Sequence, residues 1–101
     1  MSEDKKIENL SETVQLFKIF SDLTRLRIID LLYSGEHAVQ SIADTLETSQ
    51  SAISHQLKLL RDLNVVKTRK SGKQVIYCLK DNHIKKIFLI GYSHATECKW
   101  K

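Results

Sequence analysis

The sequence has few of the residues that mark secreted, disulfide-linked or membrane proteins. Its 101 residues include no proline, three glycines and two cysteines, and no low-complexity linker or repeat interrupts them. Two cysteines are too few for a disulfide framework or a zinc knuckle. The first residues, 1–6, are polar and lack the apolar core of a signal peptide, and the apolar stretches are far shorter than a membrane span. We therefore expect one cytoplasmic domain, 1–101, with reduced thiols.

The composition is that of a folded protein with an anionic partner. Hydrophobic residues make up 42% of the chain and charged residues 28%, which excludes a disordered class. The net charge is +4 and the pI is about 9.1. A basic domain of this size favours nucleic acid as the partner. The alternative is a soluble protein that is basic by chance.

Apolar spacing predicts two helices in the first third of the chain. Apolar residues recur at helical spacing between Leu10 and Phe17, which predicts a first helix over about residues 8–20. The pair Ser21-Asp22 can cap a second helix over residues 23–33. Because apolar side chains cover much of its circumference, we expect this second helix to be the central buried one.

The middle of the chain predicts a pair of helices separated by a short turn. Residues 39–46 form a short amphipathic segment, and residues 50–63 form a longer one. Between them lies Glu47-Thr48-Ser49, in which either hydroxyl can cap the longer helix. One face of this helix is apolar and should point inward: Ile53, Leu57 and Leu60.

After Asn64 the pattern changes to that of a β-hairpin followed by a last helix. Val65–Arg69 and Gln74–Leu79 are rich in β-branched and aromatic residues, and the segment 70–73 joins them. A final helix is expected over about residues 82–96, with Ile84, Ile87, Phe88 and Tyr92 as its apolar positions. The predicted class is mainly α with a small β-hairpin.

Two helices joined by a three-residue turn have the geometry of a helix-turn-helix, and a following basic hairpin makes it a winged helix. The N-terminal part of the second helix reads base edges in such motifs. The candidate base-reading residues are Gln50, Ser51, Ser54 and His55, and the candidate phosphate-binding residues are Lys58, Arg61, Arg69, Lys70 and Lys73. The alternatives are a solvated polar face and a winged helix that binds protein.

Near the C-terminus, Asp81-x-His83 is followed by His94-x-x-Glu97. The two histidines are eleven residues apart, so on one helix they share a face but lie about 16 Å apart along the axis. Ligands of one Zn²⁺ lie only about 2 Å from the ion. If these residues bind metal, an antiparallel copy of the helix must supply the other half, which generates two identical sites in a homodimer. Two imidazoles and two carboxylates suit Zn²⁺ and Co²⁺.

The chain resembles the ArsR/SmtB family of metal-responsive repressors over nearly its whole length. The likeness is carried by Phe17-Lys18-Ile19-Phe20-Ser21-Asp22, Thr24-Arg25-Leu26-Arg27-Ile28 and Ser49-Gln50-Ser51-Ala52-Ile53-Ser54-His55-Gln56-Leu57-Lys58-Leu59-Leu60. The resemblance implies a homodimer formed through the first and last helices, which binds an inverted repeat in operator DNA. It also implies that zinc or cobalt at Asp81, His83, His94 and Glu97 releases the DNA and derepresses metal-efflux genes.

The chain departs from many relatives at the start of the third helix. Where they carry a Glu-Leu-Cys-x-Cys-Asp-like segment, this chain reads Glu36-His37-Ala38-Val39-Gln40-Ser41 and has no cysteine. A thiolate site for soft metals is therefore not expected there. Leu23 also stands where the family commonly has a proline.

Four alternatives remain for the C-terminal pattern and the cysteines. Cys98 lies four residues after His94, so it can join or replace Glu97 as a ligand. Cys78 and Cys98 could instead serve a thiol-based redox or sulfur-sensing repressor of the same fold. A zinc hydrolase is the remote alternative, since a catalytic zinc keeps an open position for water; we expect no enzyme. Asp81 could also be an ordinary helix cap beside two ordinary histidines.

Overall fold

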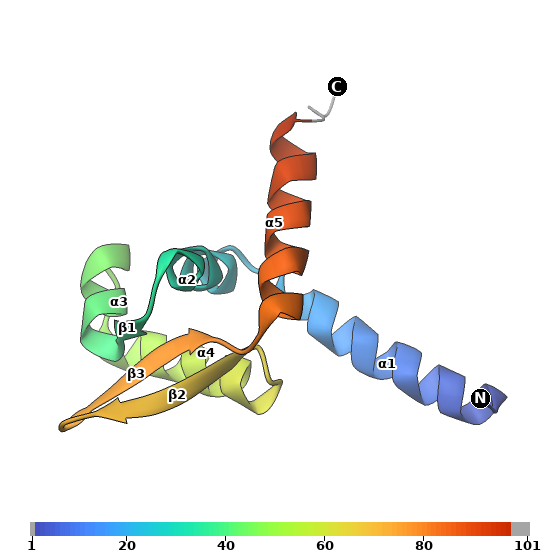
Figure 1. Cartoon of the computed structure of the whole chain (residues 1–101), viewed down its shortest axis with the longest axis horizontal. Coiled ribbons are helices and arrows are strands. Elements are labelled where there is room, and N and C mark those ends of the chain that lie inside the picture. Colours follow the sequence, from blue (N-terminus) through green and yellow to red (C-terminus); the bar gives the residue numbers. More distant parts are fainter. Residues whose placement is uncertain (1, 98–101) are drawn as a thin grey trace.

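The computed structural model describes residues 2–97, and within them it contains five helices and a three-stranded sheet. The elements follow the order α1 (Glu3–Ile19), α2 (Leu23–Ser34), β1 (His37–Ala38), α3 (Val39–Leu46), α4 (Gln50–Asp62), β2 (Val66–Ser71), β3 (Gln74–Leu79) and α5 (Asn82–Glu97). Helices α2, α3 and α4 and the sheet form the body, while α1 and α5 extend away from it (Figure 1). The predicted winged helix-turn-helix, mainly α with a hairpin, is confirmed.

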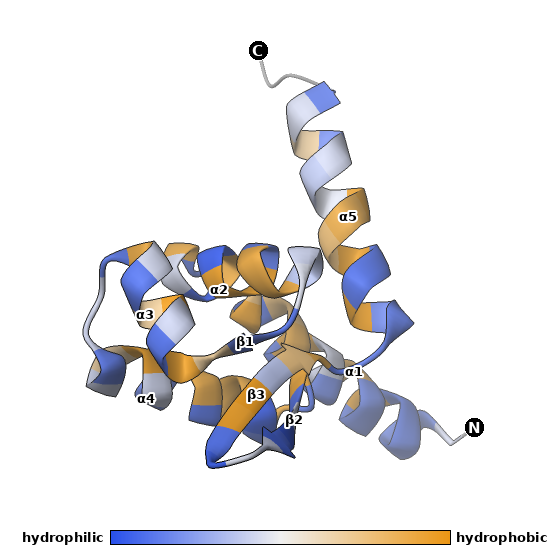
Figure 2. Cartoon of the chain, turned by 60° about the vertical axis from the view of Figure 1, so that its left-hand side comes forward, coloured by the Kyte–Doolittle hydropathy of each residue, from blue (hydrophilic) through white to orange (hydrophobic). Residues whose placement is uncertain are grey.

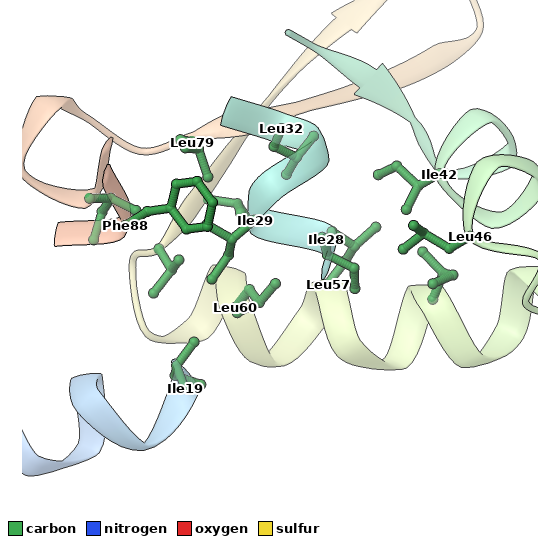
Figure 3. Packing of buried hydrophobic residues seen from close by; sticks show 14 of the residues in the cluster. Ile19, Ile28, Ile29, Leu32, Ile42, Leu46, Leu57, Leu60, Leu79 and Phe88 are labelled. Carbon is green, nitrogen blue, oxygen red and sulfur yellow. The ribbon is translucent and has the colours of Figure 1, made fainter. Parts of the chain in front are cut away.

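One apolar core holds the body together, and α2 lies at its centre as predicted. Ile28 and Ile29 of α2 are 0% exposed, as are the three residues of α4 expected to point inward, Ile53, Leu57 and Leu60. Figure 3 shows the α2 side chains packed between those of α3, α4 and α5. Burial of this apolar surface is the main term that stabilises the fold.

Side-chain caps fix where α2 and α4 begin. The Asp22 carboxylate accepts a hydrogen bond from the Arg25 N–H at 2.9 Å, and the Ser49 hydroxyl accepts one from the Ala52 N–H at 3.2 Å. The neighbouring Thr48 hydroxyl instead donates to the Leu46 carbonyl at 3.1 Å. Of the two hydroxyls that could cap α4, Ser49 therefore does so.

The predicted start of the first helix was wrong by five residues, because α1 begins at Glu3 and not near residue 8. Its first turn is polar and adds nothing to the apolar periodicity from which the start was inferred. A cap stabilises this turn instead: the Ser2 hydroxyl accepts from the Lys5 N–H at 3.2 Å. Glu3 and Asp4 add negative charge at the positive end of the helix dipole.

The hairpin of β2 and β3 is tighter than predicted. Ser71 pairs with Gln74, so the turn has only two central residues, Gly72 and Lys73, and not the four of 70–73. Gly72 has a φ of +62°, which glycine adopts without the steric cost that a Cβ imposes. The strand β2 also begins at Val66, one residue later than expected.

A third strand, β1, was not predicted. His37 pairs with Tyr77 and Ala38 with Ile76, both antiparallel, giving the order β1-β3-β2. Two residues are too short to show an alternating pattern, so the sequence alone does not indicate that they pair with β3. In the part of the chain that the structure describes, no helix has both the length and the apolar character needed to cross a membrane.

Candidate functional site

The exposed face of α4 carries the residues predicted to read DNA. Its buried side packs on the core, and the opposite side leaves every predicted α4 residue exposed to solvent: Gln50, Ser51, Ser54, His55, Lys58 and Arg61. The first turn of α4 lies beside α3, as in a helix-turn-helix (Figure 1). The geometry therefore presents a polar helix face with small side chains near its N-terminus and cations near its C-terminus.

The side chain of Gln50 is held by Gln40 of α3, which is itself held by Asp44, and neither contact was predicted from the sequence. The Gln50 Nε2 donates to the Oε1 of Gln40. The Gln40 Nε2 in turn donates to the Asp44 Oδ1 at 2.7 Å. Gln40 and Asp44 are at i, i+4 on one helix, a pairing that the sequence could have indicated. The contact with Gln50 depends on how α3 meets α4, which sequence spacing does not show.

The wing presents two of its three predicted cations freely to solvent. Lys70 and Lys73 are exposed at the tip of the hairpin. Arg69 instead forms a bidentate ion pair with Glu36, with Nε–Oε2 at 2.9 Å and Nη2–Oε1 at 3.1 Å. The hydrogen bond from Arg69 is the main reason that the pKa of the Glu36 carboxyl lies below its usual value. The Arg69 guanidinium is therefore already engaged when the protein is free.

Asp81 and His83 lie together at the junction of β3 and α5. Asp81 stands just outside the helix, as the spacing required, and its Oδ1 accepts from the Ile84 N–H at 3.1 Å. Its other oxygen, Oδ2, lies 3.6 Å from the Nδ1 of His83. The Ile84 hydrogen bond, more than the nearby imidazole, lowers the pKa of the Asp81 carboxyl. One carboxylate oxygen and one imidazole nitrogen are thus close together and exposed.

His94 and Glu97 are exposed near the other end of α5. Among the residues that the structure describes, no three His, Cys, Asp or Glu side chains gather into a group that could hold a metal. One chain therefore provides two separated halves of the predicted site. Cys98 lies outside the described residues, and Cys78 in β3 is half-buried.

An apolar surface joins α1 to α5. Phe17 of α1 is 55% exposed, Ile90 of α5 is 67% exposed, and the two line a groove of about 600 Å³ together with Phe20, Leu26 and Tyr92. The exposed apolar side chains of α1 continue this surface: Ile7, Leu10 and Val14. In Figure 2 hydrophobic colour covers the middle of α5, and the part of the helix beyond it projects away from the body. A contiguous apolar surface of this kind marks an interaction site.

Known proteins match this arrangement. The family model described as "Bacterial regulatory protein, arsR family" matches residues 22–68. A Staphylococcus aureus homolog of the cadmium resistance transcriptional regulatory protein CadC is 37% identical over 91 residues, which cover 89% of this chain and 75% of the relative. The chain belongs to the ArsR family. A Synechocystis homolog of the transcriptional repressor SmtB is 33% identical over 90% of this chain and 69% of its own length.

Solved structures agree with the ArsR-family assignment. A Mycobacterium bovis protein, described as a homodimeric winged helix-turn-helix DNA-binding domain and a possible ArsR-family regulator, has a TM-score of 0.91 at 27% identity. The match covers 96% of this chain and 90% of that one. Reduced HlyU from Vibrio cholerae has a TM-score of 0.79 at 32% identity, over 94% and 98% of the two chains.

The arsR family model covers the middle of the chain and not its two ends. It runs from the cap of α2 to the middle of β2 and so includes the whole helix-turn-helix. Helices α1 and α5 lie outside it. The exposed stripe of α1, the α5 side of the groove and the candidate metal ligands therefore lie outside the residues that the family model matches.

Proposed function

We propose that the chain is a metal-responsive transcriptional repressor whose homodimer binds operator DNA in the cytoplasm and releases it when Zn²⁺ or Co²⁺ binds. The exposed α4 face, with Lys70 and Lys73 on the wing, supports DNA binding. The names of the relatives, which include a cadmium-resistance regulator and an SmtB homolog, support a metal signal.

The apolar surface of α1 and α5 supports a homodimer. An exposed stripe along α1 and the groove beside α5 would be covered by the same surface of a second copy, as two-fold symmetry requires. The homodimeric Mycobacterium bovis domain has the same fold. Two α4 helices in such a dimer would reach two half-sites about 34 Å apart on an inverted repeat.

The observation that carries the metal proposal is the division of four suitable ligands between the two ends of α5. Asp81 and His83 lie at the start of the helix, and His94 and Glu97 lie in its last turns. In an antiparallel α5 pair, the first two would meet His94 and Glu97 of the partner subunit. Oxygen and imidazole ligands in a set of four fit tetrahedral Zn²⁺ or Co²⁺, which would cross-link the two helices.

The cross-linked helices would regulate DNA binding by favouring a different arrangement of the two winged domains. Near-complete release requires about 5.5 kcal/mol of differential binding between the two arrangements, and bound DNA must weaken metal affinity by the same factor. The resemblance to the ArsR/SmtB family implies that the second ring nitrogen of His94 bonds backbone near Asn64, where the chain turns with a φ of +58° after α4. His94→Gln should therefore lose regulation by metal more than it loses DNA affinity.

The first experiment is a Co²⁺ titration of the purified protein followed by optical absorption. We expect intense visible d–d bands that saturate at about one ion per chain and disappear when Zn²⁺ is added. His83→Ala should abolish the bands, whereas His55→Ala, which removes an exposed imidazole on α4, should leave them unchanged. A strong near-ultraviolet thiolate band would instead add Cys98 to the ligands.

Mixed dimers test whether the site lies between chains. Neither His83→Ala nor His94→Ala alone should bind Co²⁺. After unfolding together and refolding, about half of the dimers are mixed and each carries one intact site, so about a quarter of the wild-type absorbance should return. No recovery from well-folded mixed dimers would contradict an inter-chain site.

A DNA titration tests the other half of the proposal. Fluorescence anisotropy with duplex DNA should show affinity that falls steeply with salt, because phosphate contacts release counterions. Adding Zn²⁺ should release the wild-type protein and not His83→Ala. Absence of salt-dependent DNA binding would favour a winged helix that contacts protein.

A further inference from the structure

Three polar side chains form a line from the surface of α3 to the first turn of α4. Asp44 accepts from Gln40 at 2.7 Å, and Gln40 accepts from Gln50. Gln50 is the first residue of α4 and one of the residues that face DNA in the proposed function. The side chain that would read a base is therefore not free to rotate independently of α3.

The chemistry of the line fixes the direction of every hydrogen bond in it. A glutamine amide has a donor end and an acceptor end of nearly the same shape, so either could face a neighbour. A carboxylate only accepts. Asp44 therefore turns the Nε2 of Gln40 toward itself, which leaves the Oε1 of Gln40 facing Gln50. Gln50 must then present its own Nε2 as the donor.

This polarity determines what Gln50 can offer to a base. One N–H is used by Gln40, and the other N–H remains together with the Oε1 acceptor. A donor and an acceptor side by side match adenine, which presents N7 as acceptor and N6 as donor in the major groove. Guanine presents two acceptors, O6 and N7, and would require two donors. The fixed amide therefore suits adenine and opposes guanine.

We propose that Asp44, acting through Gln40, is a specificity-determining positioning residue that sets the orientation of the Gln50 amide and so selects adenine over guanine. The inference rests on the proposed DNA-binding function. All three side chains are exposed in the free protein, where water competes for their hydrogen bonds. Where DNA covers Gln50, part of this competing water is displaced, so the hydrogen bonds of the line are stronger and their direction matters more.

Asp44→Asn tests the polarity while keeping the shape. An asparagine can donate as well as accept, so the whole line can reverse: the Gln40 Nε2 then donates to Gln50, and Gln50 turns both N–H groups toward the base. Adenine and guanine should become similarly acceptable. A good bidentate pair discriminates by about 5- to 150-fold, and the adenine-to-guanine ratio at this one position should fall by a factor in that range.

The experiment is a selection of the full-length wild-type protein on a pool of random-sequence DNA duplexes, followed by sequencing. The same pool is used for Gln50→Ala, which locates the position that Gln50 reads, and for Asp44→Asn. Gln40→Leu breaks the line at its centre and should relax the same position. Asp30→Asn, an equal change of charge on an exposed residue of α2, is the matched control and should keep the wild-type preference.

The results separate this inference from the proposed function. If the wild-type protein enriches no sequence, the proposed sequence-specific DNA binding is wrong. If it enriches a motif, the inference requires an adenine position that Gln50→Ala loses and that Asp44→Asn relaxes toward guanine. A position without adenine preference, an unchanged ratio in Asp44→Asn, or an even loss of preference at all positions would each overturn it.

Discussion

Replacing Glu36 with glutamine should release Arg69 for contact with DNA. In the free protein the Glu36 carboxylate holds the guanidinium through two hydrogen bonds, at 2.9 and 3.1 Å. Bidentate, charge-assisted pairs of this kind are among the stronger hydrogen-bonding arrangements of an arginine. We infer that in the wild-type protein Arg69 stays on Glu36 and that Lys70 and Lys73 make the phosphate contacts of the wing.

The size of the effect follows from counterion release. Each phosphate that a protein neutralises adds about 0.9 to the slope of log affinity against log salt concentration. One additional contact in Glu36→Gln should therefore steepen the slope by about 0.9. Over a fourfold rise in salt, from about 50 to 200 mM, the variant should lose about 3.5-fold more affinity than the wild-type protein loses. At the lower salt concentration it should bind more tightly.

Fluorescence anisotropy with one duplex at five or more salt concentrations measures both slopes. Arg69→Gln alone should change the wild-type slope little, and the double variant Glu36→Gln, Arg69→Gln should return the steeper slope to the wild-type value. Comparison of the double variant with Arg69→Gln measures the general effect on the slope of losing the negative charge of Glu36. If Arg69→Gln alone lowers the slope by about 0.9, Arg69 already contacts phosphate and the reasoning is refuted.

Three further predictions concern stability and assembly. Asp81→Ala should lower the melting temperature at neutral pH. Because the folded-state pKa of Asp81 is depressed, the ionised carboxylate stabilises the fold above about pH 4, and this stabilisation is lost as the pH falls through the folded-state pKa. The melting curves of variant and wild type should therefore converge in acid. Leu57→Ala, at a side chain that is 0% exposed, should reduce the free energy of unfolding in urea by about 2–5 kcal/mol, whereas Leu59→Ala, at 37% exposure, should cost less than half as much. Ile90→Lys should place a charge on the apolar surface of α5 and yield a folded monomer in sedimentation velocity; a stable dimer would show that this surface is not the interface.

Periodicity predicted those elements whose pattern is local. The bounds of α3, residues 39–46, and of β3, residues 74–79, agree with the structure, because each element has an unbroken pattern between clear breaks. The end of α4 differs by one residue, since Leu63 and Asn64 form the turn after Asp62. The first turn of α1 was missed because a cap and charge stabilise it and apolar spacing does not.

Contacts between elements could not be predicted in the same way. The strand β1 exists because β3 offers a free edge to His37 and Ala38, and no feature of two residues reveals that edge. The exposure of the candidate residues on α4 was predicted correctly, because the buried and exposed faces of one helix follow from its period. The hydrogen-bonded partner of Gln50 lies ten residues away in the sequence and depends on the packing of α3 against α4.

The candidate metal ligands show the same division between local and long-range information. The position of Asp81 outside α5 follows from its spacing to His83, and the structure has it there. The meeting of the two halves of the site depends on a second chain, which no property of one chain determines. The four-ligand site therefore stays a prediction that the mixed-dimer experiment tests directly.

The segment 36–41, where the family resemblance would allow cysteines and this chain has none, also contacts two residues that we propose face DNA. The resemblance implies that family members with cysteines in this segment use it to bind metal. In this chain Glu36 holds Arg69 of the wing and Gln40 holds Gln50 of α4. If metal binds only at α5, the segment 36–41 is free to position the wing and α4, the two elements that we propose face DNA. The two contacts should then act independently: Glu36→Gln should change salt dependence without changing base preference, and Asp44→Asn should do the reverse.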